Sequence, residues 1–479
     1  MWVKEALQLP CFQEISKAVQ KTNYKVYVVG GYVRDYFLKK NTQDIDIVVE
    51  SPPQAFSENK LPLHGIEFAK IFAQIIDAEV NIFENFGTAL VKKDGLEIEF
   101  VGTRKESYRR DSRKPIVENG TLLDDQLRRD FTINAMSISL NPENYGLLID
   151  PFNGLEDLNN KIIKTPTDPD VTFCDDPLRM LRAIRFATTL GFTIEKNTYE
   201  AIKNNVNRIK IISKERITDE LNKIISAQKP SVGFKLLFYT GLLEIIFPEL
   251  YNLHGVEIRD GKAHKDNFFH TLQVLDNLSN HSENLWLRWA ALLHDIAKPL
   301  TKKFYPKQGW TFHGHEEKGA QMVPQIFKKL KLPLNEKMKF VQKMVQLHQR
   351  PIALVDEEVT DSAIRRLIVD AGEDLEALLT LCRADITTRD PNKLEKYLQN
   401  YDNIEKRIQE VIEADNLRNW QPPITGEMIM QYFQLKPSPA VGQIKNAIRN
   451  AILDGLIPND YEHAFEYMKK IGNEILSKS

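Results

Sequence analysis

The sequence predicts an α+β fold in which an N-terminal mixed sheet with helices is followed by helices alone. Two observations support this class. Short β-branched runs that end at turn residues lie between residues 26 and 101. From residue 230 onward, the segments instead carry the apolar spacing of amphipathic helices. The 479 residues exceed one ordinary domain, so about two to four domains are expected.

The composition narrows the classes of function. The formal net charge is −2, so any binding of nucleic acid must rely on a local basic patch. The three cysteines, Cys11, Cys174 and Cys382, are scattered, which fits a reducing cytoplasm without a disulfide framework. The N-terminus contains acids, unlike a signal peptide, and no apolar run reaches the length of a membrane span. We therefore expect a cytoplasmic protein without a membrane partner.

The first candidate site lies in the segment 27–49, YVVGGYVRDYFLKKNTQDIDIVV. A strand-like run ends at Gly30 and Gly31, where backbone N–H groups suit phosphate oxygens. Asp44 and Asp46 share one face of the next strand, and such a pair of carboxylates requires solvent or a cation. Mg²⁺ prefers these oxygens. Each short motif alone is more often a plain turn or strand end, but together they predict a two-metal site for nucleotidyl transfer.

The next elements offer a third carboxylate. Residues 54–78 predict a helix, and residues 86–90 and 96–101 predict strands. Glu97 and Glu99 share one face of the second strand. Glu99 is the favoured partner for the two aspartates, and a solvated edge face is the alternative.

A polar stretch follows at residues 102–127, and its lack of apolar periodicity predicts a mobile loop. Its positive charges suit a triphosphate or an RNA backbone, although an ordinary solvated loop is the alternative. These residues are Arg104, Arg109, Arg110, Arg113 and Lys114.

The segment RRDFTIN combines arginine guanidinium groups, which suit phosphate, with Asp and Asn oxygens that can accept from a ribose hydroxyl. Its candidates are Arg128, Arg129, Asp130 and Asn134. A capped helix end with a surface charge pair is the alternative.

Residues 175–187, DDPLRMLRAIRFA, predict a helix that starts near Pro177. Asp176 and Arg179 lie three residues apart, and a buried pair of this kind offers both donors and acceptors to the edge of a nucleobase. A surface ion pair is the alternative. Arg182 and Arg185 follow as candidates for base or phosphate contacts.

The helical part of the chain contains a set of histidines and aspartates suited to a divalent metal. The candidate ligands are His270, His294, Asp295 and Asp385. The alternative is that these histidines are packed in the core. Lys298, which follows the His-Asp pair, favours the metal site. Three further histidines, His313, His315 and His348, are candidates for substrate or a second metal, with unrelated surface positions as the alternative.

The motifs of the first half of the chain resemble those of the class II tRNA nucleotidyltransferase and poly(A) polymerase family, within the polymerase-β-like superfamily. In chain order, these motifs are GGYVRD, DIDIVV, RRDFTINAM, DPFNGLEDL and DDPLR. The histidine set resembles the HD phosphohydrolase superfamily. The resemblance implies a nucleotidyltransferase head at 1–150 and a neck for base recognition and RNA binding at 151–230. It further implies a helical body with the HD region at 231–395 and a helical tail at 396–479.

The resemblance also implies a function and the residues that perform it. The expected reaction is addition of CCA to the 3′ end of tRNA from CTP and ATP, with Mg²⁺ on Asp44 and Asp46 and with Glu99 as a further candidate ligand. The expected nucleotide-binding residues are Gly30, Gly31, Arg34, Arg128, Arg129, Asp130, Asn134, Asp176, Arg179, Arg182 and Arg185. Asp176 and Arg179 take the place of the family's protein template, and Asp175 stands where many relatives carry Glu. The HD site would hold Ni, Mn, Fe or Zn.

Three other readings stay open. A poly(A) polymerase usually has a strongly basic tail and no HD signature, whereas the isoelectric point here is about 6.6. A CC-adding or A-adding half-enzyme would share nearly all motifs, and the apparently intact loop at 103–125 argues against the CC-adding form only. Alternatively, the protein acts mainly as a phosphohydrolase through its HD region, or the HD region is a structural module stabilised by metal. Two smaller expectations are an ion pair between Arg216 and Glu220, and tRNA contact through Lys445 and Arg449 in the tail.

Overall fold

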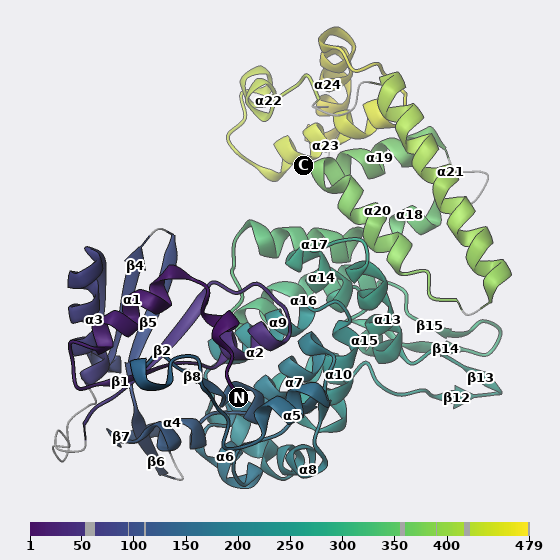
Figure 1. Ribbon diagram of the computed structural model, residues 1–479. Coiled ribbons are helices and arrows are strands. Elements are labelled where there is room, and N and C mark those ends of the chain that lie inside the picture. Colours follow the sequence, from purple (N-terminus) through teal and green to yellow (C-terminus); the bar gives the residue numbers. More distant parts are fainter. Residues whose placement is uncertain are drawn as a thin grey trace. The chain divides into compact units, whose positions relative to one another are not determined.

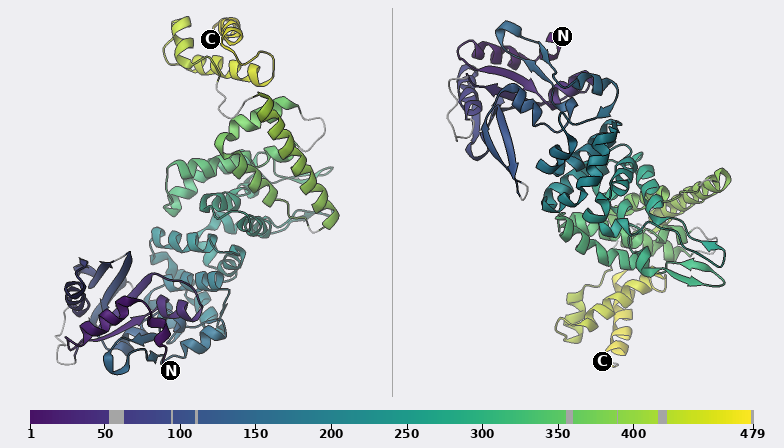
Figure 2. Two further views of the ribbon diagram at one scale, coloured as in Figure 1. Left: turned by 45° about the horizontal axis from the view of Figure 1, so that its top comes forward. Right: turned by 90° about the horizontal axis from the view of Figure 1, so that it is seen from below.

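Figure 1 shows the computed structural model of the chain. The structure describes residues 1–52, 63–93, 95–109, 112–354, 360–388, 390–415 and 422–477. The chain forms two compact units, Met1–Tyr251 and Asn252–Ser479. Both views in Figure 2 show a sheet among helices in the purple and blue first unit and mainly helices in the green and yellow second unit.

The first unit contains a seven-stranded sheet in the order β3-β4-β5-β2-β1-β8-β9. Strands β2 and β5 run parallel, and the other neighbouring pairs run antiparallel. This mixed sheet confirms the predicted fold class. The strands are β1 Lys25–Val29, β2 Asp44–Glu50, β3 Glu79–Phe83, β4 Thr88–Lys93, β5 Leu96–Gly102, β8 Ser137–Ser139 and β9 Leu148–Ile149.

Helices cover one face of this sheet. Helix α3 (His64–Ile76) packs on β2, β4 and β5, and helix α1 (Pro10–Val19) packs on α3 and β1. The ring of Phe100 on β5 lies 5.5 Å from that of Phe72 on α3, so aromatic contacts join the layers. The described part of the predicted 54–78 helix begins at residue 64, and residues 53–62 lie outside the described part of the chain.

Alternation along β2 sends its two aspartates to the opposite face. Ile45 and Ile47 are buried on the face that α3 covers, whereas Asp44, Asp46 and Val48 project the other way. Val48 packs there with Leu122 of helix α4 (Leu122–Leu127). The apolar stretch of β2 is therefore covered on both faces, and its polar end carries the aspartates.

The expectation of a structureless loop at 102–127 is wrong. This segment forms an antiparallel pair, β6 (Arg104–Arg109) with β7 (Ser112–Asn119), followed by helix α4. A ladder satisfies backbone polar groups whatever the side chains are, so a polar segment can pair without apolar alternation. Ion pairs of Glu106 with Arg104 (2.7 Å) and Arg128 (3.3 Å) add to it. Residues 110 and 111 lie outside the described residues, and with them the predicted role of Arg110.

Helices follow the sheet to the end of the first unit. They are α5 Gly154–Asn159, α6 Pro169–Asp175, α7 Leu178–Leu190, α8 Lys196–Asn205, α9 Lys214–Ile225, α10 Pro230–Tyr239, α11 Leu242–Ile246 and α12 Pro248–Tyr251. The motif DPFNGLED attaches these helices to the head. Asp150 accepts bonds from the backbone N–H groups of Gly154 (2.7 Å) and Leu155 (2.9 Å), and Asp157 accepts one from the Thr132 hydroxyl (2.7 Å).

The second unit is mainly helical. Its helices are α13 Asn267–Ser279, α14 Leu285–Leu293, α15 Lys298–Thr301, α16 His315–Leu330, α17 Glu336–Leu347, α18 Arg350–Ala353, α19 Asp361–Ala371, α20 Leu375–Ala384, α21 Pro391–Asp415, α22 Gly426–Phe433, α23 Pro439–Leu453 and α24 Tyr461–Leu476. Two short antiparallel pairs also occur, β12 (Ile258–Arg259) with β13 (Lys262–Ala263), and β14 (Lys303–Tyr305) with β15 (Gly309–Thr311). No described helix is long and apolar enough to cross a membrane.

The tail helices α22, α23 and α24 share a separate apolar core. Helix α23 carries the two basic residues singled out as a tRNA contact. Arg449 forms an ion pair with Asp370 of α19, a carboxylate that also pairs with Arg350. Lys445 is exposed.

Candidate functional sites

The turn after β1 brings Gly30 against the second aspartate of β2. Gly30 has a φ of +71°, and a Cβ atom there would lie 2.9 Å from Nη1 of Arg129 and 3.6 Å from Oδ2 of Asp46. Only glycine fits this backbone conformation and this space. Because the N–H of Gly30 already donates to the carbonyl of Met136, Gly30 shapes the site and does not supply a free phosphate donor.

The carboxylates of the head site lie on neighbouring parallel strands. Asp46 is in register with Glu99, so both side chains project from the same face. The pKa of the Asp46 carboxyl is raised to about 6. Burial is the main cause, and the adjacent charge of Asp44 is the second. A half-buried carboxylate beside a second one fits a divalent cation. Glu99 is exposed, and among the described residues these three acids do not converge into one cluster of ligand atoms.

Asp125 is a buried residue of the head site that sequence reasoning missed. Its carboxylate accepts hydrogen bonds from Nε of Arg128 (2.9 Å) and from Nη2 of Arg129 (3.0 Å). Burial alone would raise the pKa of Asp125, but the two guanidinium groups outweigh it and hold the pKa below its usual value. The spacing of three and four residues in DDQLRR was a signal for this pairing. Asp125 therefore positions the two arginines.

Asp130 joins the head to the first neck helices. One carboxylate oxygen accepts from Nε of Arg182 on α7 (2.7 Å), and the other accepts from Nδ2 of Asn134 (3.0 Å). Asn134 in turn accepts from Nη1 of Arg34 (2.8 Å), which lies on helix α2 (Gly31–Phe37). Burial would raise the pKa of Asp130, but Arg182 and Asn134 keep it below its usual value. The predicted residues Arg34, Asp130, Asn134 and Arg182 thus form one network.

Phe186 lies at the centre of the arginines, and the sequence did not indicate it. The guanidinium carbons of Arg34, Arg182 and Arg185 lie 5.1, 5.5 and 3.7 Å from the centre of its ring. Arg185 also pairs with Glu220 at 2.6 Å. The ring face favours these cations, and each of them also pairs with a carboxylate: Arg34 with Asp35, Arg182 with Asp130 and Arg185 with Glu220.

Asp176 and Arg179 lie near each other but do not form a side-chain pair. Asp176 follows α6 in an extended conformation, and its carboxylate accepts from the N–H of Leu178 (3.1 Å). Its ion-pair partner is Arg216 of α9 at 3.7 Å, while Arg179 donates from Nη2 to the carbonyl of Arg128 (2.6 Å). The predicted ion pair between Arg216 and Glu220 is therefore wrong. Glu220 pairs with Arg185, and Arg216 pairs with Asp176.

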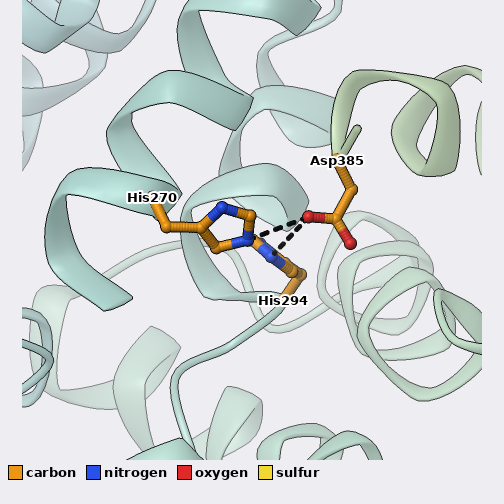
Figure 3. A group of neighbouring side chains, drawn as sticks. All are labelled: His270, His294 and Asp385. Carbon is orange, nitrogen blue, oxygen red and sulfur yellow. Dashed lines mark ion pairs between the residues drawn. The ribbon is translucent and has the colours of Figure 1, made fainter. Parts of the chain in front are cut away.

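The second unit brings the predicted metal ligands together at helix ends. His270 lies on α13, and His294 and Asp385 directly follow α14 and α20. Figure 3 shows both imidazoles directed at one oxygen of Asp385. The distances from Nε2 to that oxygen are 2.9 Å for His270 and 3.6 Å for His294. This donor set is typical of a divalent transition metal.

Asp295 lies between this cluster and a second one. Its Oδ2 is 3.2 Å from Nε2 of His294 and 2.6 Å from Nζ of Lys298. Its Oδ1 faces Nε2 of His315 at 3.3 Å and Nε2 of His348 at 3.9 Å. His313 is exposed and takes no part in either cluster. His315 and His348, which the sequence offered as candidates for substrate or a second metal, thus lie together beside Asp295.

An open cavity of about 640 Å³ leads to this centre. It is lined by basic, aromatic and metal-site residues, among them Lys265, Lys298, Trp310, Phe312, His270 and Asp385. Positive charge and aromatic surface next to metal ligands suit an anionic ester with an aromatic group.

Three family models match consecutive stretches of the chain. A family model described as Poly A polymerase head domain matches residues 26–164. A second, Probable RNA and SrmB- binding site of polymerase A, matches residues 191–253, and HD domain matches residues 267–390.

Curated relatives resemble much of the chain. The Multifunctional CCA protein of Shewanella frigidimarina is 34% identical over 317 residues, which cover 64% of this chain and 70% of that protein. The A-adding tRNA nucleotidyltransferase of Deinococcus radiodurans is 32% identical over 339 residues, covering 69% and 75%. The CCA-adding enzyme of Streptococcus sanguinis is 28% identical over 466 residues, covering 96% and 97%.

Solved structures share the fold. The Bacillus stearothermophilus CCA-adding enzyme in complex with CTP matches with a TM-score of 0.64 at 22% identity, over 98% of this chain and all (100%) of that one. The Thermotoga maritima CCA-adding enzyme complexed with tRNA matches with a TM-score of 0.60 at 23% identity, over 100% of this chain and 98% of that one.

Proposed function

This chain belongs to the class II tRNA nucleotidyltransferase and poly(A) polymerase family, and we propose that it adds CCA to the 3′ end of tRNA from CTP and ATP. The observation that carries the proposal is the network in which Asp130 joins Arg34 of the head to Arg182 of α7. Asn134 of this network and Asp46 of β2 both lie next to Gly30, so the network and that carboxylate border the same turn. The names of the relatives in Shewanella and Streptococcus support the same reaction.

In this proposal, Asp44 and Asp46 hold Mg²⁺, with Glu99 as a further acid on the same face. Two ions would be held there, one to lower the pKa of the tRNA 3′-hydroxyl for attack and one to stabilise the pyrophosphate that leaves. The chain's own residues orient the nucleotide. Arg129 lies beside Gly30 and Arg34 beside Gly31, and both bind the triphosphate. Arg128, Asp130 and Asn134 hold the ribose and phosphates, and Gly31 opens the helix next to them.

Asp176 and Arg179 select the base, with Arg182 and Arg185 beside them. Asp176 and Arg179 do not pair with each other. The Asp176 carboxylate instead lies 3.7 Å from Arg216 and is half-exposed. An incoming base edge is then able to take over these groups. We further propose that the protein works in the cytoplasm, since Cys11, Cys174 and Cys382 are all free thiols.

A second candidate function belongs to the HD region. We propose that it holds a divalent transition metal (Ni, Mn, Fe or Zn) on His270, His294, Asp295 and Asp385 and hydrolyses phosphomonoesters or cyclic phosphodiesters. Two buried polar atoms, Nε2 of His294 and Oδ1 of Asp295, have no hydrogen-bond partner. Buried polar atoms are normally satisfied, so these two support a cation site here. The basic and aromatic lining of the adjacent cavity fits such substrates.

A gel assay tests the main proposal. Purified protein, Mg²⁺ and tRNA lacking its 3′ CCA are mixed with CTP, with ATP, or with both. We expect three added nucleotides only when both are present. A stop after two additions would identify a CC-adding half-enzyme. A added only to tRNA that ends in CC would identify an A-adding one, the activity named for the Deinococcus relative. A long A tail would identify a poly(A) polymerase.

The replacement Asp176→Asn should change nucleotide choice more than rate. The surface ion pair with Arg216 contributes at most about 1 kcal/mol, so the fold should persist. Losing one acceptor at a base edge should lower the preference for the correct nucleotide by roughly 10-fold or more. Competition between CTP and ATP on tRNA ending in CC measures this preference. Asp219→Asn, on the exposed side of α9, is the control, and unchanged selectivity in Asp176→Asn would exclude the templating role.

Removing the HD metal should separate the two activities. The replacement His294→Gln should abolish hydrolysis of a phosphomonoester such as p-nitrophenyl phosphate while CCA addition continues, because the two sites lie in different compact units. His313→Gln changes an exposed histidine outside the clusters and should leave both activities unchanged. Loss of CCA addition together with a lower melting temperature in His294→Gln would instead show that the metal supports the structure.

A further inference from the structure

The imidazole of His270 is supported differently from the other clustered histidines. In His294, His315 and His348, Nδ1 lies 2.7, 2.8 and 2.6 Å from the backbone carbonyl oxygen three residues earlier in the chain. Nδ1 of His270 lies instead 2.9 Å from the hydroxyl oxygen of Thr387, a side chain that follows α20. The local backbone therefore orients the other three rings, whereas the orientation of His270 depends on a distant side chain.

Packing leaves the ring of His270 more freedom than that of His294. His270 lines the cavity of about 640 Å³ and also a second cavity of about 1080 Å³, which is lined by α13 and by residues that follow α20. Its side chain keeps 11% of its surface exposed, against 1% for His294. The χ2 torsion of histidine is intrinsically broad. A hydrogen bond to Nδ1 is thus an effective way to fix the plane of this ring.

The partner of Nδ1 comes from the same short segment as the metal-site carboxylate. Thr387 stands two residues after Asp385, and Oδ1 of Asp385 lies 2.9 Å from Nε2 of His270. Asn277, also on α13, donates from Nδ2 to the carbonyl of Ala384 at 2.9 Å. These bonds join α13 to the chain on both sides of Asp385. The two ring nitrogens of His270 consequently both face this segment, as Figure 3 shows for Nε2.

The hydroxyl has the chemistry that a metal-binding histidine needs behind it. A histidine that offers the Nε2 lone pair to an ion carries its proton on Nδ1, and that proton requires an acceptor. The oxygen of Thr387 is within hydrogen-bond distance of Nδ1 and can accept. Partners of this kind fix the orientation of the ring and raise the basicity of the ligand, and losing one typically lowers metal affinity 10- to 100-fold.

We propose that Thr387 is a positioning residue of the HD site. Its hydroxyl accepts from Nδ1 of His270 and holds the Nε2 lone pair toward the ion shared with His294 and Asp385. The proposal rests on the metal site proposed above and deepens it. Thr387 acts through His270 and touches neither the ion nor the substrate. Thr387 and Thr388 are adjacent in the sequence, and only the structure distinguishes them.

Metal affinity tests the proposal without relying on activity. The parent protein is the full chain with Asp44→Asn and Asp46→Asn, which remove the carboxylates of the head site. It is stripped with a chelator and titrated with Mn²⁺, and the free ion is measured by its sharp electron paramagnetic resonance signal. We expect Thr387→Val, which keeps the shape but loses the hydroxyl, to raise the Kd roughly 10- to 100-fold.

Three variants frame this result. Thr387→Ser keeps the hydroxyl and should restore the Kd to within a few-fold of the parent value. His294→Gln removes a ligand and sets the full loss of the site, so Thr387→Val should lie between it and the parent. Thr388→Val is the matched control, because its hydroxyl accepts only from the N–H of Asp390, at 3.3 Å. We expect the parent Kd for this control.

The outcomes separate the role of Thr387 from the metal site itself. An unchanged Kd in Thr387→Val, or an equal loss in Thr387→Val and Thr387→Ser, would overturn the positioning role and leave the metal site in place. A parent protein that binds no Mn²⁺ would overturn both. Melting temperatures measured without metal should agree among the variants at residue 387. If Thr387→Val does not fold, Thr387→Ala decides.

Discussion

Replacing Asp46 with Asn should abolish nucleotide addition, with a loss of roughly 10³-fold or more in rate. Asp46 lies beside the Gly30 turn, and Arg129 approaches the same point. A neutral amide cannot provide the charge that holds a divalent ion between protein and phosphates. Because burial and Asp44 already disfavour the charged form of Asp46, its replacement should not weaken the fold.

The measurement is single-turnover extension of tRNA that lacks its terminal A, with saturating ATP and Mg²⁺. Melting temperatures of the variant and the wild type should agree. Glu79→Gln removes an exposed acid from β3 of the same sheet and is the matched control, for which we expect the wild-type rate. Activity of Asp46→Asn within a factor of a few of the wild type would contradict the proposed metal role.

The replacement Asp125→Asn should cost about 3 kcal/mol of the stability of the first unit, because it leaves two guanidinium groups without their shared buried partner. Asp125 has no exposed side-chain surface, whereas Arg128 and Arg129 keep 18% and 17% of theirs. The loss should appear as faster amide hydrogen exchange around α4, measured by mass spectrometry. Its neighbour Asp124 is half-buried and caps α4 in a box with Thr121, so Asp124→Ala should cost only about 1 kcal/mol.

The stabilisation from Asp125 should also depend on pH. Its pKa in the folded protein lies below the ordinary value of 3.8, so the folded state favours the charged carboxylate. The contribution is therefore complete above about pH 4 to 5 and is lost as the pH falls through the folded pKa. The difference in melting temperature between wild type and Asp125→Asn should shrink as the pH falls below about 4. A difference that stays constant in this range would contradict the role of the charge.

Local sequence determined the elements that carry the chemistry. The β-branched runs around Gly30 and Asp46 became β1 and β2, because strand and turn signals lie within a few residues of each other. Apolar helical spacing likewise predicted the helices that carry His270 and His294. The order of motifs was enough to identify the family. The roles assigned to individual site residues stay predictions.

Tertiary structure decided which polar groups meet. Asp176 pairs with Arg216, Glu220 with Arg185, and Phe186 collects its arginines from α2 and α7. It also decided that the polar residues 104–119 pair as strands, and that His315 and His348 face Asp295. These contacts join residues far apart in the chain, so periodicity does not encode them. Each depends on packing that brings the elements together and on burial that makes an unpaired charge costly.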